Sequence, residues 1–196
     1  MYVKRILPNG VRLITERIDN MRTVSVGIWV GNGSRYEPAE LGGVSHFIEH
    51  MIFKGTEKRS ARHIAIAIDA LGGQANAFTD KECTCYYMKV LDSRLKNAVA
   101  LLADMFLHSR FAQEDLELER GVVLEEIDMY EDTPEDVAAE RLIAGCFPGA
   151  LGRPVLGRSS SLARQTGESL RAFMARHYAA PRVVAALSGS FTDEDL

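Results

Sequence analysis

Three side chains that bind metals or move protons lie close together in the sequence, namely His46, Glu49 and His50. Histidines four residues apart lie one turn apart on the same side of an α-helix, so both imidazoles can reach one metal ion. A glutamate directly before the second histidine can reach a water molecule on that metal. This H-x-x-E-H order is the reverse of the commoner H-E-x-x-H metal motif. A chance match is expected in about one chain of this size in a hundred, so we favour a metal site over a solvated polar face.

The same stretch, from Gly43 to Gly55, has the hydrophobic periodicity of a helix with one side in a protein core. Five apolar residues recur at helical spacing on the side opposite the histidines, namely Val44, Phe47, Ile48, Met51 and Ile52. Within this stretch no lysine or arginine precedes Lys54, which is unusual for a solvated helix face. The pattern therefore predicts a helix that is anchored on one side and presents its histidines on the other.

Catalytic zinc sites usually have three protein ligands and a water, so the two histidines need a further partner. A predicted helix over 113–131 carries a stripe that is apolar except for two glutamates, formed by Leu116, Glu119, Val123, Glu126 and Tyr130. A carboxylate in an apolar stripe is costly unless it is paired or bound to a metal. Glu125 lies about 100° away on a mixed face, so we assign Glu126 as the third ligand and Glu119 as a residue that orients a histidine or the water. Both could instead be solvated, because many other acidic residues surround them.

The remaining segments predict an α+β fold with one mostly antiparallel sheet and helices packed against it, in a single domain spanning residues 1–196. Strands are predicted over 2–7, 11–17, 23–30, 74–79, 82–91 and 182–188. Asp80-Lys81 should form a two-residue turn between the fourth and fifth of these strands. Further helices are predicted over 61–71, 93–108, 134–146 and 168–177. Ser60 and Thr133 are candidate N-caps, and either Thr166 or Gly167 lies at the start of the last helix.

Composition and charge speak against several classes of protein. The net charge of −4 gives no basic excess for nucleic acid or an anionic membrane surface. No apolar run approaches the roughly 20 residues that a membrane-spanning helix needs. The three cysteines do not form a disulfide framework, and the N-terminal residues lack the features of a signal or transit peptide. We expect a cytoplasmic bacterial protein.

At these motifs the chain resembles the pitrilysin/insulinase family of zinc peptidases, whose metal motif is the inverted H-x-x-E-H. Within that family it is most similar to the mitochondrial processing peptidase β subunits and their bacterial relatives. The matching stretches cover most of the chain, at Leu7–Glu16, Gly42–Thr56, Gly72–Leu91, Glu119–Asp136 and His177–Gly189.

The resemblance implies a zinc-dependent endopeptidase in which His46, His50 and Glu126 bind Zn²⁺. It also implies that Glu49 is the general base, acting on a metal-activated water, and that Glu119 supports the ligands. A segment of four residues would form an exposed edge strand that pairs with an extended peptide substrate, namely Asn76, Ala77, Phe78 and Thr79.

Members of this family consist of two homologous halves, each about as long as this chain, and the second half closes the chamber around the substrate. We therefore expect a fragment of a longer chain or one partner of a split enzyme, weak or inactive without a homologous C-terminal half or partner subunit; a dimer is one such arrangement. The alternative function is a non-catalytic, peptide-binding or regulatory half of a processing-peptidase-like complex. The presence of every motif residue favours the peptidase. A purely structural zinc fits less well, because such sites are usually closed by four Cys or His ligands.

Overall fold

The computed structural model describes all 196 residues, from Met1 to Leu196. Its strands form one sheet in the order β1-β2-β6-β3-β5-β4. The strand bounds are Val3–Ile6 for β1, Arg12–Arg17 for β2, Thr23–Val30 for β3, Gln74–Thr79 for β4, Thr84–Leu91 for β5 and Val183–Gly189 for β6. Only β2 and β6 are parallel neighbours. The expected mostly antiparallel sheet is therefore confirmed.

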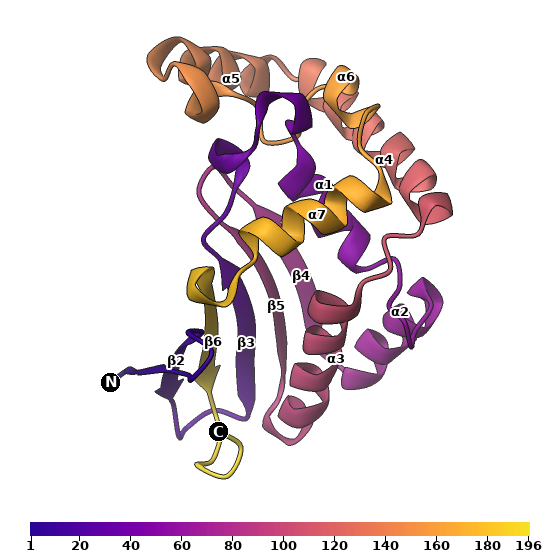
Figure 1. Ribbon diagram of the computed structural model, residues 1–196. Helices are drawn as coiled ribbons and strands as arrows, with labels where there is room; N and C mark the ends of the chain where they lie inside the picture. Colours follow the sequence, from indigo (N-terminus) through magenta and orange to yellow (C-terminus); the bar gives the residue numbers. More distant parts are fainter.

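Helices complete the α+β fold, and Figure 1 shows α3 and α7 beside the sheet while α5 lies beyond its end. The helix bounds are Val44–Ile52 for α1, Ala61–Leu71 for α2, Leu95–His108 for α3, Gln113–Glu131 for α4, Pro134–Cys146 for α5, Ser159–Leu162 for α6 and Gly167–His177 for α7. Short 3₁₀ helices occupy connecting segments, at Ser34–Tyr36, Ala39–Leu41, Asp92–Arg94, Gly149–Gly152 and Ala180–Arg182. None of the helices has both the length and the apolar character needed to cross a bilayer.

Alternation along the strands turns one face of the sheet toward the core. The inward side chains of β3 and β5 are buried, namely Val24, Val26, Val30, Tyr86, Met88 and Val90. They form one hydrophobic cluster with side chains of α1 and α3. Burying an apolar side chain of this size stabilises a fold by about 1.5–3 kcal/mol, so this cluster can hold α1 firmly against the sheet.

Helix α1 carries its apolar side into this cluster, as predicted. All five residues that the periodicity assigns to the core are at most 1% exposed, namely Val44, Phe47, Ile48, Met51 and Ile52. Gly43 precedes the helix with a φ of 87°, a left-handed conformation that glycine adopts without steric penalty. A Cβ atom there would lie 2.4 Å from the carbonyl oxygen of Leu156. A glycine is therefore needed where the chain turns into α1.

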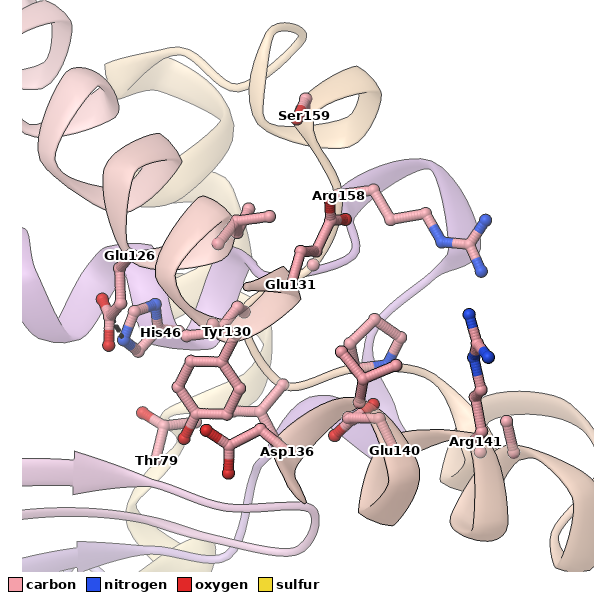
Figure 2. Close-up of a pocket in the computed structure, with 18 of the residues that line it drawn as sticks. His46, Thr79, Glu126, Tyr130, Glu131, Asp136, Glu140, Arg141, Arg158 and Ser159 are labelled. Atoms are coloured by element: carbon pink, nitrogen blue, oxygen red, sulfur yellow. Dashed lines mark ion pairs between the residues drawn. The ribbon is translucent and has the colours of Figure 1, made fainter. Parts of the chain in front are cut away.

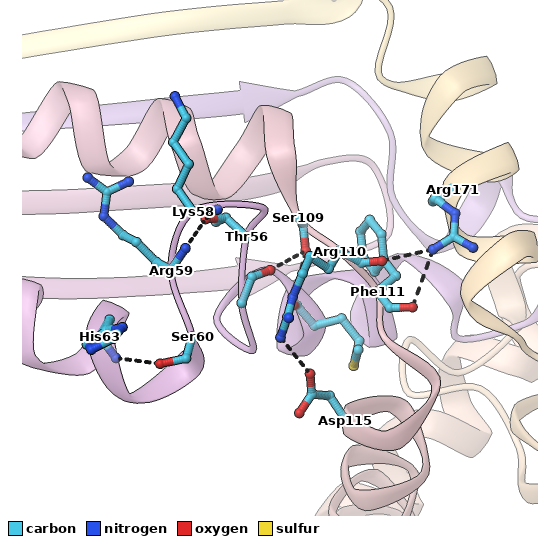
Figure 3. A network of polar contacts seen from close by, with 12 residues as sticks. Thr56, Lys58, Arg59, Ser60, His63, Ser109, Arg110, Phe111, Asp115 and Arg171 are labelled. Carbon is cyan, nitrogen blue, oxygen red and sulfur yellow. Dashed lines mark hydrogen bonds and ion pairs between the residues drawn. The ribbon is translucent and has the colours of Figure 1, made fainter.

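A polar network holds the other end of α1 (Figure 3). The Ser109 hydroxyl donates to the carbonyl of Met51 at 3.3 Å, and the Arg110 amide donates to the carbonyl of Gly55 at 3.1 Å. Arg171 of α7 in turn donates to the carbonyl of Arg110 at 2.9 Å. The network therefore joins α1, the connection between α3 and α4, and α7, which lie far apart in the sequence.

The turn before β5 corrects one prediction. β5 begins at Thr84 rather than Glu82, so four residues connect β4 to β5, and the predicted two-residue turn is wrong. The carboxylate of Asp80 accepts hydrogen bonds from the amides of Glu82 and Cys83, at 2.6 and 2.7 Å. Local side-chain bonds of this kind compete with strand pairing, and they stabilise the wider turn.

The predicted helix starts are confirmed in part. Ser60 and Thr166 cap α2 and α7 by accepting from backbone amides, at 3.3 and 3.1 Å. Thr133 occupies the N-cap position of α5, but its hydroxyl donates to the carbonyl of Met129 at 2.9 Å instead of capping the helix. The helix predicted from residue 93 begins at Leu95, after a 3₁₀ turn.

Candidate metal centre and active site

Helices α1 and α4 bring the two motif histidines and Glu126 together. Oε2 of Glu126 lies 3.5 Å from Nε2 of His46 and 3.6 Å from Nε2 of His50. One ligand atom from each residue lies within 4.8 Å of the other two. The imidazole rings meet edge to face, with their centroids 4.6 Å apart. Glu125, the neighbouring glutamate on α4, is exposed.

The spacing and chemistry of these atoms fit a zinc ion. Zinc binds histidine nitrogen at about 2.0–2.1 Å and carboxylate oxygen at about 2.0–2.2 Å, so two ligands of a tetrahedral site lie about 3.4 Å apart. The separations of 3.5 and 3.6 Å from Glu126 are close to that value. Two imidazoles and one carboxylate, with a fourth position for water, are also a ligand set found in catalytic zinc sites.

Glu119 orients the ring of His50 by contacting Nδ1, the ring nitrogen that does not face Glu126. Its Oε2 lies 3.1 Å from Nδ1 of His50. A carboxylate only accepts, so Nδ1 carries the proton and Nε2 keeps a lone pair for a metal. Oε1 of Glu119 lies 2.5 Å from Nζ of Lys54. Because Glu119 is only 7% exposed, this double pairing compensates for the burial of its charge. No spacing pattern in the sequence marked Lys54.

Burial and neighbouring charges give the two histidines different proton affinities. Burial, together with repulsion from His50, lowers the pKa of His46 to about 4 despite the opposing charge of Glu126. Burial also lowers the pKa of His50, but the carboxylates of Glu126 and Glu119 outweigh burial and raise it. His46 is therefore neutral near pH 7, which is the form that binds metals.

Glu49 lies beside the histidines, and the Thr79 hydroxyl of β4 donates to its Oε2 at 2.6 Å. Burial raises the pKa of Glu49, against the opposing effects of the Thr79 hydrogen bond and the charge of His50. A carboxylate with a raised pKa accepts a proton more readily at neutral pH, as a general base must. Glu49 lines the same cavity as His46 and Glu126.

This cavity has a volume of about 1110 Å³ and is bounded by α1, β4, α4, α5 and the segment 152–160 (Figure 2). Among the four predicted substrate contacts, Ala77, Phe78 and Thr79 line the cavity, whereas Asn76 does not. Strand β4 is at the edge of the sheet, as expected. The backbone groups on its outer side therefore have no partner strand within the chain.

One wall of the cavity contains charged residues that the sequence analysis did not identify. Figure 2 shows Asp136 of α5 close to Tyr130 of α4, with Glu140 further along α5. Glu140 lies 3.7 Å from Nζ of Lys81. No residue of α5 is buried, and no pattern in the sequence singled out the side of this helix that faces the cavity.

The sequence of this chain matches a known protein family and several of its members. The model of the insulinase family, peptidase family M16, matches residues 12–159. The chain belongs to the insulinase peptidase family. An uncharacterized zinc protease of Bacillus subtilis is 48% identical to it over 186 residues, which cover 94% of this chain and 46% of that protein. A probable β subunit of the mitochondrial processing peptidase of Arabidopsis thaliana is 40% identical over 191 residues, which cover 97% of this chain and 36% of that protein.

A solved structure of the insulinase family has the same fold. The crystal structure of a peptidase M16 inactive domain from Pseudomonas fluorescens matches 100% of this chain and 48% of that chain, with a TM-score of 0.92 and 19% identity. At this identity the match supports the fold alone. The chain spans less than half the length of the two relatives named above. The family resemblance and fold class expected from the sequence are confirmed.

Proposed function

We propose that this chain is the metal-binding half of a zinc endopeptidase that hydrolyses extended peptides. The observation that carries the proposal is the approach of two imidazole nitrogens to one oxygen of Glu126, at 3.5 and 3.6 Å. Glu49 lies in the same cavity. Membership of a peptidase family supports peptide hydrolysis, and the zinc protease from Bacillus subtilis supports the choice of metal.

His46, His50 and Glu126 would hold the ion. When bound to such ligands, zinc polarises a carbonyl group and lowers the pKa of a coordinated water to about 7. The role of the chain is to keep the Nε2 atoms of His46 and His50 available to the ion. Glu119 does this for His50 by accepting a hydrogen bond from Nδ1–H, which keeps the proton on Nδ1.

Glu49 acts as the general base. Its carboxylate takes a proton from the attacking water and passes it to the nitrogen of the leaving amine. Thr79 occupies Oε2 of this carboxylate, so Oε1 is the oxygen left for proton transfer. The raised pKa of Glu49 suits both steps, because the group must be deprotonated before the attack and protonated after it.

The substrate binds as an extended strand along the outer edge of β4, through main-chain hydrogen bonds. Ala77 and Phe78 lie on this strand and line the cavity. Thr79 ends the strand and contacts Glu49 directly. A peptide paired with β4 would therefore run past the base. Peptides whose edge-facing amides are N-methylated should compete poorly with their unmodified counterparts, and equal competition would contradict this binding mode.

The relatives are more than twice as long as this chain, and we propose that a homologous second half or a partner subunit covers the cavity. Activity then belongs to the assembled protein, whereas zinc binding belongs to this chain, which contains all three ligands.

Two measurements test the proposed function. Elemental analysis should find one zinc per chain, lost on treatment with a chelator. The full-length protein should cleave fluorogenic peptides, and the chelator should stop cleavage until zinc is restored. A chain that binds no zinc would refute the proposal. Zinc binding together with peptide binding but no cleavage by the full-length protein would favour the alternative of a non-catalytic, peptide-binding half.

A further inference from the structure

The first turn of α1 is held by a buried carboxylate from outside the helix. Glu37 is 4% exposed, and its two oxygens accept hydrogen bonds from the amides of Gly43 and Ser45, at 2.7 and 2.8 Å. The proposed mechanism gives Glu37 no role. Its position nevertheless links it to the metal site, because His46 directly follows Ser45.

Helix starts leave several backbone N–H groups without partners, and the N-cap side chain usually accepts from one of them. The N-cap of α1 is Gly43, which has no side chain to do so. Glu37 takes over this task from six residues upstream, and its negative charge lies at the positive end of the helix dipole. The hydroxyl of Ser45 also accepts from Nδ2 of Asn32 at 3.2 Å. This first turn is therefore fixed from two directions.

The segment containing Glu37 is also tied to the wall of the cavity. Arg153 donates to the carbonyl oxygen of Glu37 at 2.5 Å, and Lys81 donates to the carbonyl oxygen of Arg153 at the same distance. The neighbours of Arg153, Gly152 and Pro154, line the cavity. Glu37 thus connects the start of α1 to the surface that faces the substrate.

The two histidines differ in how their side chains are held. Nδ1 of His50 is bonded to Glu119, but Nδ1 of His46 is buried without a hydrogen-bond partner. No hydrogen bond at Nδ1 therefore orients the ring of His46, and its placement depends on the backbone of α1 and on packing. Zinc–ligand distances stay within about 0.2 Å of their standard values, so the position of this backbone matters.

We propose that Glu37 is a positioning residue for the metal site. Through the amides of Gly43 and Ser45 it fixes the first turn of α1 and, with it, the position of Nε2 of His46 relative to Glu126. This inference rests on the proposed zinc function. Glu37 and Glu119 then have matching tasks, because each holds one histidine, the former through the backbone and the latter through the imidazole ring.

Zinc affinity of variants of this chain tests the inference. Dissociation constants are measured against a competing chelator, at a temperature where thermal unfolding shows every variant to be folded. Glu37→Ala should bind zinc about 10–100-fold more weakly, the range found when groups supporting metal ligands are removed. Glu37→Gln keeps one acceptor oxygen and should lose less. The matched control is Asp104→Asn, which changes another buried carboxylate, bonded to Thr56 of the turn after α1 at 2.8 Å, and should lose stability but keep zinc affinity.

Amide hydrogen exchange of the metal-free chain provides a second readout. Glu37→Ala should speed exchange at Ser45 and His46 and leave Ile52 unchanged. If the unmodified chain binds no zinc, the proposed function fails and the inference falls with it. If the unmodified chain binds zinc and both Glu37 variants bind it equally tightly, only the inference is overturned. It is also overturned if Asp104→Asn weakens zinc binding as much as Glu37→Ala, because general destabilisation would then explain the loss.

Discussion

Replacing Glu119 should weaken zinc binding although all three proposed ligands remain in place. Glu119 is only 7% exposed. Its carboxylate contacts Nδ1 of His50 at 3.1 Å and Nζ of Lys54 at 2.5 Å. Removing it leaves the imidazole free to rotate and lets the proton move from Nδ1 to Nε2, the atom that a metal requires. Both effects oppose metal binding.

The expected size of the effect follows from these two contacts. Loss of a group that orients a metal-binding histidine typically lowers affinity by about 10–100-fold, or about 1.4–2.8 kcal/mol. Glu119→Gln keeps an oxygen that can accept the hydrogen bond from Nδ1–H but loses the ion pair with Lys54, so we expect the lower end of this range. Glu119→Ala loses both contacts and should reach the upper end.

Competition with a chelating dye near neutral pH measures this affinity. Glu125→Gln is the matched control, because Glu125 lies on the exposed side of the same helix and should leave zinc binding unchanged. Thermal unfolding of the metal-free variants separates loss of affinity from loss of folded protein. The reasoning is refuted if folded Glu119→Ala binds zinc as tightly as the unmodified chain.

Three further changes have expected outcomes. Glu49→Gln should lower peptide hydrolysis by the full-length protein at least about 10²-fold with unchanged zinc content; hydrolysis at the normal rate would exclude Glu49 as the base. Burial raises the pKa of Asp104, but the hydrogen bonds that it accepts outweigh burial and lower it from 3.8. The Asp104 carboxylate contributes about 1.5–3 kcal/mol to the free energy of unfolding, and this contribution should be present above pH 3.8 and disappear as pH falls through the lowered pKa. In denaturant unfolding, Asp104→Asn should therefore have a lower unfolding free energy than the unmodified chain, by a difference that shrinks in acid. A difference that does not change with pH would contradict this. Gly43→Ala should lower the unfolding free energy by at least about 1–2 kcal/mol, because φ is 87° there; an unchanged melting temperature would contradict the strain.

The parts of the site that lie within one helix could be predicted from the sequence. His46 and His50 are four residues apart, so helical geometry places them on one side of α1. Glu126 shares a helical stripe with buried Val123, so periodicity places it on the same side of α4 as this core residue. Periodicity also identified the buried side of α1, because every apolar residue on that side enters one core. No spacing in the sequence predicts that α1 approaches α4. The approach is inferred from chemistry, because one metal ion would need ligands from both helices.

Residues that act through tertiary contacts could not be predicted in this way. Glu37 reaches α1 from a loop, and Lys54 reaches Glu119 from the turn after α1. Neither contact follows from a repeat in the sequence. The predicted two-residue turn at Asp80 is wrong because the hydrogen bond that its carboxylate accepts from a backbone amide outweighs the strand pattern.

The grouping of ionisable residues between α1 and α4 is more consistent with a binding site than with a contribution to folding. His46 and Glu119 are each 7% exposed, and Glu49 and Glu126 line the cavity together with His46. Burying polar and charged groups costs stability unless each is paired, and apolar residues of similar size often stabilise a fold more. Lys54 compensates for only one of these carboxylates. A divalent cation that binds only the folded chain would offset the remaining cost, since its binding free energy adds to that of folding.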